Sequence, residues 1–427
     1  RGVYVLLLIS LLGYTGRVSG QESVTITQCY EWARANYPQI HQMGLIDQTE
    51  RYSLSNVGKA WLPQLSVSGK ASYQSDVTKL PLDGDKISSL LPGFEIPSLS
   101  KDQYQVVAQV DQTIWDGGST RSARALTRAE AIANREQLES ELYALNDRVN
   151  QIYFGCLLQD ELIRQNALLQ KELQVNIERI EAMMENGVAN QSDLESMEVE
   201  LLNARQNEIE LKASRTVYRQ MLATFINKPL TDQVVLKTPE SPERSLSTQI
   251  NRPELRALDA KSEWIETQNK QVTAGLMPRI GAFVQGGYGR PGLNMLEDSF
   301  EPYYVAGVRL SWNLGKLYTL KNDRRKIEVS RRQIDVQRET FLFNTRLQLL
   351  QQNTEIKKMT DLMRADDDII RLRTSIKQAA EVKLENGVIS VTDLIREINA
   401  EDMARQTAAA HRVQRLMTIY NYMYTTN

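Results

Sequence analysis

Two very long stretches of this sequence are almost free of glycine and proline, the residues that most often end helices. Residues 316–386 contain neither, and residues 119–186 contain only Gly155. Apolar residues recur there at helical spacing, as at Leu138 and Leu142. At 1.5 Å per residue, each stretch predicts a helix about 100 Å long. No single globular core is that tall, so these helices are expected to pack side by side in a coiled-coil-like layer.

The sequence is also an internal duplication. Residues 185–194 read ENGVANQSDL and residues 385–394 read ENGVISVTDL, each time at the end of a long helical stretch. Other landmarks recur in the same order: an Asn-x-Pro triplet, a helical segment, a second proline, a pair of alternating strands and a tryptophan before a turn. We therefore predict two repeats, residues 21–230 and 251–427, joined by a linker at residues 231–250.

Each repeat is predicted to hold the same elements in the same order. A helix precedes a β-hairpin, which is followed by the long helix, a turn and a shorter helix. In the first repeat the hairpin, the long helix and the last helix span residues 64–115, 119–186 and 192–227. In the second repeat they span residues 279–313, 316–386 and 391–424.

The hairpin strands alternate apolar and polar residues with a period of two, as in residues 64–73, QLSVSGKASY. Each strand has about ten residues, the length that crosses a bilayer as a tilted strand. Tyrosine and tryptophan gather at the strand ends, where amphipathic rings favour the lipid–water boundary. A soluble sandwich would alternate in the same way, but four strands are too few for a stable sandwich and too few to close a barrel alone.

Composition excludes several classes of function. The net charge of −2 offers no electrostatic basis for binding nucleic acid. The chain has two histidines and two cysteines, with no CxxC, HExxH, GxSxG, P-loop or GxGxxG motif, so no zinc site or nucleophile pair is predicted. The acidic residues follow helical patterns and are interpreted as solvated faces. We therefore predict a protein without enzymatic activity and without a cofactor.

Residues 1–20 read as a signal peptide. Arg1 is followed, after Gly2, by the apolar run VYVLLLISLL and then by small and polar residues up to Gly20. The run is about half the length that a transmembrane helix needs. A basic start, a short apolar run and a small-residue exit are typical of an export signal. We predict cleavage near Gly20 and an exported protein; a buried N-terminal strand or helix is the alternative.

The doubled order of Asn-x-Pro, helix, LPQLSVSG at residues 62–69, hairpin, long helix and ENGV motif resembles the TolC family of outer-membrane efflux proteins. The resemblance covers essentially the whole chain after the signal peptide. It implies a mainly α fold with transmembrane β-strands: a homotrimer in which four strands per protomer form a 12-stranded β-barrel in the outer membrane, continuous with a long periplasmic α-helical barrel. It also implies an exit duct for tripartite efflux or type I secretion. Its partners would be outer-membrane lipid, a periplasmic adaptor and an inner-membrane RND or ABC pump.

Two other classes are open from the residues alone. A periplasmic adaptor, or membrane fusion protein, is also built on a coiled-coil hairpin, but it carries one hairpin where this chain has two. A soluble coiled-coil protein would need neither a signal peptide nor alternating strands of bilayer-crossing length.

The resemblance places the two ENGV turns at the periplasmic entrance of the duct. Gly187 and Gly387 fall on the glycines of the family's tip motif, where a left-handed residue ends the helix. Asp193 and Asp393 follow in the first turn of the next helix, where they are expected either to cap that helix or to line the pore. Arg396 stands in place of the family's second pore aspartate, so we expect a less cation-selective entrance.

The family's polar lock between the tips is also changed in this sequence. Its acceptor side matches Ser192 and Asp193, but Leu384 and Ile389 stand at the donor positions. We therefore expect an apolar contact in place of the lock.

At 1.5 Å per residue, Cys29 and Cys156 are expected within about 15 Å of the same height along their helices, which says nothing about their lateral positions. An oxidising periplasm allows a disulfide, but disulfide geometry is demanding. We expect two buried free thiols.

Overall fold

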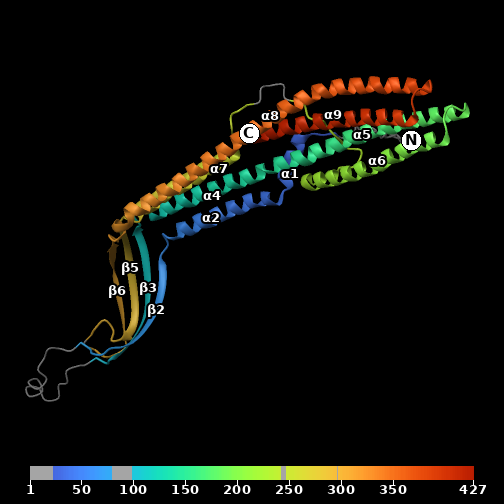
Figure 1. Cartoon of the computed structure of the whole chain (residues 1–427). Coiled ribbons are helices and arrows are strands. Elements are labelled where there is room, and N and C mark those ends of the chain that lie inside the picture. Colours follow the sequence, from blue (N-terminus) through green and yellow to red (C-terminus); the bar gives the residue numbers. More distant parts are fainter. Residues whose placement is uncertain (1–22, 79–98, 242–246, 296) are drawn as a thin grey trace, which may run out of the picture. The chain divides into compact units, whose positions relative to one another are not determined.

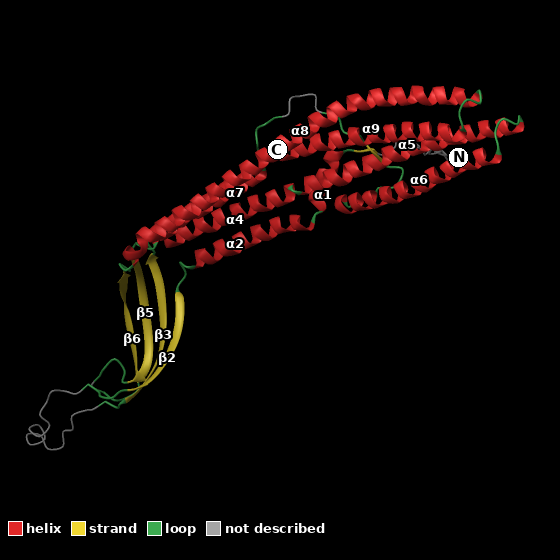
Figure 2. Cartoon of the chain, viewed as in Figure 1, coloured by secondary structure: helices red, strands yellow, loops and turns green. Residues whose placement is uncertain are grey.

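The computed structural model describes residues 23–78, 99–241, 247–295 and 297–427. The predicted signal peptide lies outside these ranges, as does most of the loop between the first two predicted strands. The chain divides into two compact units, whose helices and strands are coloured in Figure 2. We call them the helical unit, with described residues 23–40, 140–241, 247–253 and 342–427, and the sheet unit, with described residues 41–78, 99–139, 254–295 and 297–341.

The helical unit is built from long helices packed side by side (Figure 1). Its main helices are α1 (Ile26–Asn36), α5 (Leu145–Glu185), α6 (Gln191–Ile226), α9 (Val391–Thr426) and the greater part of α8 (Lys316–Glu385). Helix α5 packs against α6 and α9, and α1 packs on both α5 and α6. The short strands β1 (Ser23–Val24) and β4 (Val235–Leu236) pair in parallel. Among the helices in the described ranges, none combines the length and the apolar character needed to cross a bilayer.

An apolar core joins α1, α5, α6 and the two short strands of the helical unit. Its members include Tyr153, Phe154 and Leu222, each at most 1 % exposed. The Tyr153 hydroxyl lies 2.9 Å from the carbonyl oxygen of Val24 and 2.7 Å from that of Lys237. Helix α5 therefore holds both short strands in place through one buried side chain.

Cys29 and Cys156 belong to this core and are both free and fully buried. Burial raises the pKa of each thiol to about 12, so neither is a reactive nucleophile at physiological pH. The structure therefore agrees with the prediction of two buried free thiols.

The sheet unit contains one antiparallel sheet in the order β2-β3-β5-β6 (Figure 1). Its strands are β2 (Gln64–Tyr73), β3 (Asp102–Trp115), β5 (Arg279–Arg290) and β6 (Glu301–Ser311). The two repeats meet in the middle of the sheet, where β3 of the first repeat pairs with β5 of the second. The unit also holds α2 (Gln42–Lys59), most of α4 (Ser119–Tyr143), α7 (Pro253–Ala274) and the first part of α8. Ile265 of α7 packs there against Ile327 and Ile334 of α8.

The helices differ from the predicted ones at two places. The helix expected over residues 119–186 is interrupted at Ala144 and forms α4 and α5. Alanine is the best helix former, so nothing in the local sequence signals this interruption. The helix expected after the first Asn-x-Pro triplet is α2, and a further helix, α1, precedes it, separated from α2 by a 3-10 turn at Pro38–His41. Proline explains this division, because it lacks an N–H donor and cannot continue a helix from within.

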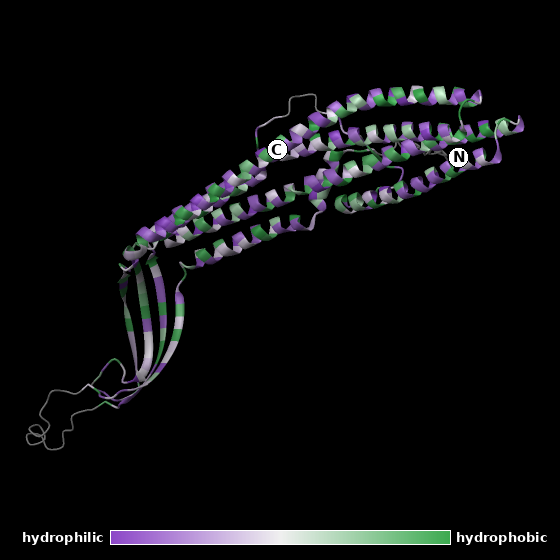
Figure 3. Ribbon diagram, in the orientation of Figure 1, coloured by the Kyte–Doolittle hydropathy of each residue, from purple (hydrophilic) through white to green (hydrophobic). Residues whose placement is uncertain are grey.

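Alternate residues along each strand give the sheet two chemically different faces, visible as alternating colours along the strands in Figure 3. The apolar face carries Leu65, Val67, Tyr104, Val106, Val110, Val284, Tyr288, Tyr304, Val308 and Leu310, all of them exposed. The polar face carries Ser66, Ser68, Lys70, Gln105, Gln109, Asp111, Gln285 and Arg309. An apolar surface of this extent indicates that lipid or another protein covers it.

Candidate functional site at the helical tips and on the sheet

Both ENGV turns fold into the same helix-ending motif, and we call them the first tip (residues 185–194) and the second tip (residues 385–394). Gly187 and Gly387 have φ angles of 72° and 69°. In the first tip the N–H of Val188 donates to the Met183 carbonyl at 2.8 Å, and the N–H of Gly187 donates to the Met184 carbonyl at 2.9 Å. The second tip repeats both bonds. This is a Schellman motif, whose left-handed residue is usually glycine because glycine has no Cβ.

Asp193 and Asp393 form capping boxes at the starts of α6 and α9. The Asp193 N–H donates to Asn190 Oδ1 at 3.1 Å, and Asp193 Oδ2 accepts from the Asn190 N–H at 3.1 Å. Ser390 takes the place of Asn190 at the second tip. Hydrogen bonds from the Ser390 hydroxyl and N–H lower the pKa of Asp393. The capping role expected for these aspartates is therefore observed at both tips.

Arg396 meets acidic groups on two sides. Its Nη2 lies 3.5 Å from Asp393 Oδ1, and its Nε lies 3.3 Å from Glu397 Oε1. The Arg396 side chain is 70 % exposed. Exposed pairs of this kind add little stability, so the main effect of Arg396 is to offset negative charge at the second tip.

An apolar cluster joins the two tips within one chain. Leu384 is 3 % exposed and packs in this cluster with Leu394 and Ile398, and Ile389 packs against it while partly buried. The first repeat contributes Leu173, Ile177, Ile180, Met197, Leu201 and Ala204. Leu384 and Ile389 thus lie in one apolar contact between the repeats.

A buried ionic cluster, which the sequence patterns did not predict, connects α5, α8 and α9. Lys377 Nζ lies 2.6 Å from Glu401 Oε2 and also pairs with Glu172 of the first repeat. Glu401 is 2 % exposed and accepts hydrogen bonds from Thr374 and Arg405, each at 2.5 Å. Burial alone would lower the pKa of Lys377, but the two carboxylates raise it above its ordinary value. The cluster therefore links the two repeats through paired buried charges, and removal of one partner would leave an uncompensated charge.

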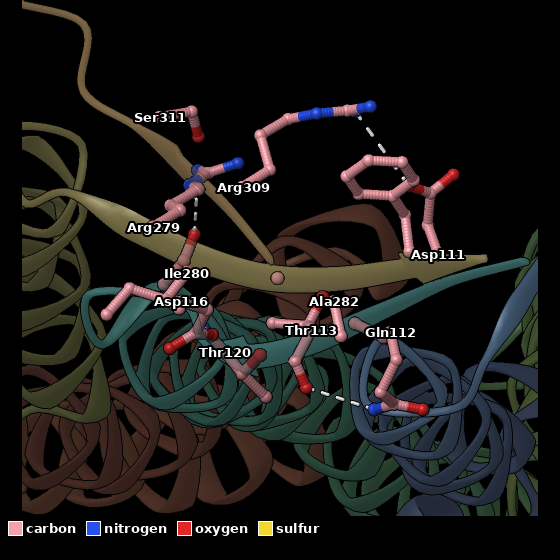
Figure 4. Close-up of a pocket in the computed structure, with 14 residues that line it drawn as sticks. Asp111, Gln112, Thr113, Asp116, Thr120, Arg279, Ile280, Ala282, Arg309 and Ser311 are labelled. Atoms are coloured by element: carbon pink, nitrogen blue, oxygen red, sulfur yellow. Dashed lines mark hydrogen bonds and ion pairs between the residues drawn. The ribbon is translucent and has the colours of Figure 1, made fainter. Parts of the chain in front are cut away.

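A pocket on the polar face of the sheet collects charged side chains near the starts of the helices (Figure 4). Arg309 Nη1 lies 3.9 Å from Asp111 Oδ1, and its guanidinium lies 4.8 Å from the centre of the Phe283 ring. Arg279 Nη2 lies 3.4 Å from Ser119 Oγ. In the described part of the chain, no group of three or more His, Cys, Asp or Glu residues could hold a metal ion. The pocket is therefore lined by charged side chains of the polar face of the sheet.

Known proteins resemble this chain in sequence over its first repeat and in fold over nearly all its length. The family model described as outer membrane efflux protein matches residues 29–228. No curated protein sequence matches the chain. The solved structure of CusC is similar with a TM-score of 0.66 at 14 % identity, over 94 % of this chain and 92 % of that one.

Two further outer membrane proteins have the same fold. VceC from Vibrio cholerae is similar with a TM-score of 0.62 at 12 % identity, over 93 % of this chain and 95 % of its own. The outer membrane channel MtrE of Neisseria gonorrhoeae, in its open state, has a TM-score of 0.62 at 14 % identity, over 94 % of this chain and 88 % of its own. At such identities these matches establish the fold, which the chain shares with these outer-membrane proteins.

Proposed function

We propose, on the premise that this chain belongs to the outer membrane efflux protein family, that it forms the outer-membrane exit duct of a tripartite efflux or type I secretion system. Such a duct receives substrate from an inner-membrane pump through a periplasmic adaptor and releases it outside the cell. The observation that carries the proposal is the sheet, which has one exposed apolar face and one polar face. The wall of a membrane-spanning barrel requires this division, with apolar residues toward lipid and polar residues toward the passage.

Aromatic side chains at both ends of the apolar face support this reading. Tyr73 and Tyr288 lie at the loop ends of β2 and β5, and both are more than half exposed. Trp115 and Trp312 lie where β3 and β6 lead into the helices, and they are 41 % and 59 % exposed. Tyrosine and tryptophan are enriched at the two boundaries between lipid and water, so the strands between them match the lipid-embedded part of a barrel.

The two edge strands of the sheet have unpaired backbone groups that further copies of the chain could pair. Strands β2 and β6 are the edge strands of the sheet in the described chain. Unpaired backbone groups are very unfavourable in lipid, so a membrane sheet has to close on itself. We propose a homotrimer in which each chain gives four strands to a 12-stranded barrel. Channels of this family generally work as trimers with adaptors and inner-membrane pumps.

We place the periplasmic entrance of the duct at the two tips. Asp193, Asp393 and Arg396 would set the charge of the entrance. Leu384 and Ile389 would hold it closed through the apolar cluster that joins the repeats. The adaptor alternative has no support from the matching proteins, and an adaptor would not need a sheet with an exposed apolar face.

Reconstitution tests the proposed function directly. Protein extracted from outer-membrane fractions should run as a heat-modifiable trimer and should produce stepwise conductance in planar bilayers. A water-soluble, monomeric protein that gives no conductance would contradict the proposal.

A further inference from the structure

An aromatic ring on the polar face of the sheet lies flat over a glycine of the neighbouring strand. Tyr303 of β6 is paired in register with Gly287 of β5, and its hydroxyl accepts a hydrogen bond from Gln105 Nε2 of β3. A Cβ atom placed on Gly287 would stand 2.3 Å from Tyr303 Cζ and 2.6 Å from its hydroxyl oxygen. Real side chains do not come that close. The ring therefore occupies the space that a side chain at position 287 would need.

A second ring shows the same arrangement with the strands exchanged, because the ring belongs to β5 and the glycine to β6. Phe283 of β5 is paired in register with Gly307 of β6. A Cβ atom on Gly307 would stand 3.1 Å from Phe283 Cε1, a tight contact. The guanidinium of Arg309 lies 4.8 Å from the centre of the same ring. Each of the two rings thus has a glycine as its direct cross-strand partner.

We propose that Gly287 and Gly307 set the free width of the passage through the sheet by seating Tyr303 and Phe283 flat against the wall. This inference rests on the proposed function, in which the polar face lines the passage. The number of strands fixes the backbone radius of a barrel, so the side chains decide how much of the interior stays open. Strand side chains normally stand perpendicular to the sheet, and a ring in that position would project into the passage. A side chain at position 287 would force the Tyr303 ring into it.

The test measures the width of the passage from one side of the membrane. Polyethylene glycols of graded size are added to the extracellular compartment of a planar bilayer that holds the full-length trimer, and the largest polymer that still enters and lowers the conductance is recorded. Gly287→Ala is expected to shift this size limit to smaller polymers, while the limit from the periplasmic compartment stays unchanged. Gly286→Ala is the matched control, because this neighbouring glycine lies on the apolar face and its Cβ would meet nothing within 4 Å.

The double variant Gly287→Ala/Tyr303→Ala is expected to restore the wild-type size limit, because the displaced ring is gone. An unchanged limit in Gly287→Ala overturns the proposal, and so does a reduced limit that the double variant does not restore. If Gly287→Ala alone does not assemble, the double variant should recover the heat-modifiable trimer, and its failure to do so also overturns the proposal. Absence of conductance in the wild-type protein would instead contradict the proposed function.

Discussion

The two carboxylate oxygens of Asp393 have different partners. Oδ2 accepts the hydrogen bonds from the hydroxyl and N–H of Ser390, and Oδ1 faces Arg396 at 3.5 Å. Capping fixes the position of the carboxylate, so its charge stays at the start of α9. The capping role and the pore-lining role proposed for this residue are therefore compatible, and in the proposed entrance Arg396 would decide how much of the Asp393 charge an entering ion meets.

At the residue scale we first predict the effect of reversing that charge. Arg396→Asp should tighten block of the channel by a multivalent cation several-fold, because the entrance of the proposed trimer would lose three positive charges and gain three negative ones beside the Asp393 carboxylates. Single-channel recordings with the blocker on the periplasmic side measure the effect. Arg364→Asp is the matched control, since Arg364 also forms an exposed i,i+3 pair, with Asp361 at 3.2 Å. Equal block in the wild type and the Arg396→Asp variant would contradict the electrostatic role of Arg396.

A second residue-scale prediction concerns Asp402, which lies beside the buried ionic cluster. Burial raises its pKa to about 6, Glu172 and Glu401 add to the shift, and Gln406 and Arg405 oppose it. The ordinary value is 3.8, so the folded protein binds the extra proton between these two values. Stability therefore falls as the pH rises through this window, and the unfavourable buried charge has its full effect above about pH 6.

Asp402→Asn removes that charge and should raise the free energy of unfolding by about 1–2 kcal/mol at neutral pH, allowing for partial screening by water. Near pH 4 the variant and the wild type should be about equally stable. Thermal unfolding of the detergent-solubilised trimer at the two pH values measures the difference. Asp368→Asn provides the control, because Asp368 is 73 % exposed and should change little at either pH. Equal stabilisation by Asp402→Asn at both pH values would refute the assignment.

At the element scale, the tips depend on the left-handed conformation of one residue each. The Cβ of an alanine at Gly387 would meet nothing within 4 Å. Any loss of stability in Gly387→Ala would therefore come from the left-handed backbone conformation alone. We expect Gly387→Ala to weaken the local structure of the second tip by about 1–2 kcal/mol. Amide hydrogen exchange at Val388, whose N–H donates to Lys383, measures local opening.

Two variants control for this effect. Gly387→Asn should exchange nearly as slowly as the wild type, because asparagine tolerates the left-handed region. Gly44→Ala, inside α2 and also free of nearby atoms, should be stabilising by about 0.5–1 kcal/mol. Unchanged exchange at Val388 in Gly387→Ala would show that the turn does not need glycine.

The same chemistry explains how much of the fold the sequence predicts. Helix ends that are marked by glycine, proline or a capping residue lie within a residue or two of their expected positions, as at Glu185, Glu385 and Ile226. The strand pairs were expected because apolar and polar residues alternate along them. The interruption at Ala144 has no local signal, because tertiary packing rather than helix propensity decides it.

Some residues of the candidate site could be predicted from local sequence motifs, and others could not. The tip residues follow from local motifs that end or cap helices, so a repeated sequence pattern reveals them. The ionic cluster around Lys377 and Glu401 could not be predicted, because its partners come from three helices and Glu172 belongs to the other repeat. Only the i,i+4 spacing of Glu401 and Arg405 indicates an ion pair in the sequence. Such pairs are usual on solvated helix faces, so the spacing does not indicate a buried cluster. The pairing of Tyr303 with Gly287 and of Phe283 with Gly307 likewise depends on strand register, which the alternation of apolar and polar residues does not specify by itself.

At the scale of the whole molecule, the surface of α8 argues that one chain is incomplete. In the helical unit, α8 buries Thr345 and Leu349 along one side. Phe343, Leu347 and Leu350 form an apolar stripe at i, i+4 and i+7 spacing, and they are 61 %, 51 % and 65 % exposed. A helix with two apolar sides belongs between two neighbours, and the described chain covers only one of the two sides. A second copy of the chain, as in the proposed trimer, would cover the other.

This stripe leads to a prediction about assembly. Burying Phe343 and Leu350 against a second copy would contribute about 1.5–3 kcal/mol each, so a charge at either position should oppose trimer formation. Phe343→Asp and Leu350→Asp should each raise the fraction of monomer, measured by native mass spectrometry or light scattering of the detergent-solubilised protein. Gln348→Asp introduces the same charge on the same helix at an exposed polar position and should leave the trimer intact. If both stripe variants stay as trimeric as the control, the stripe faces solvent in the assembly, and α8 meets its neighbour through another side.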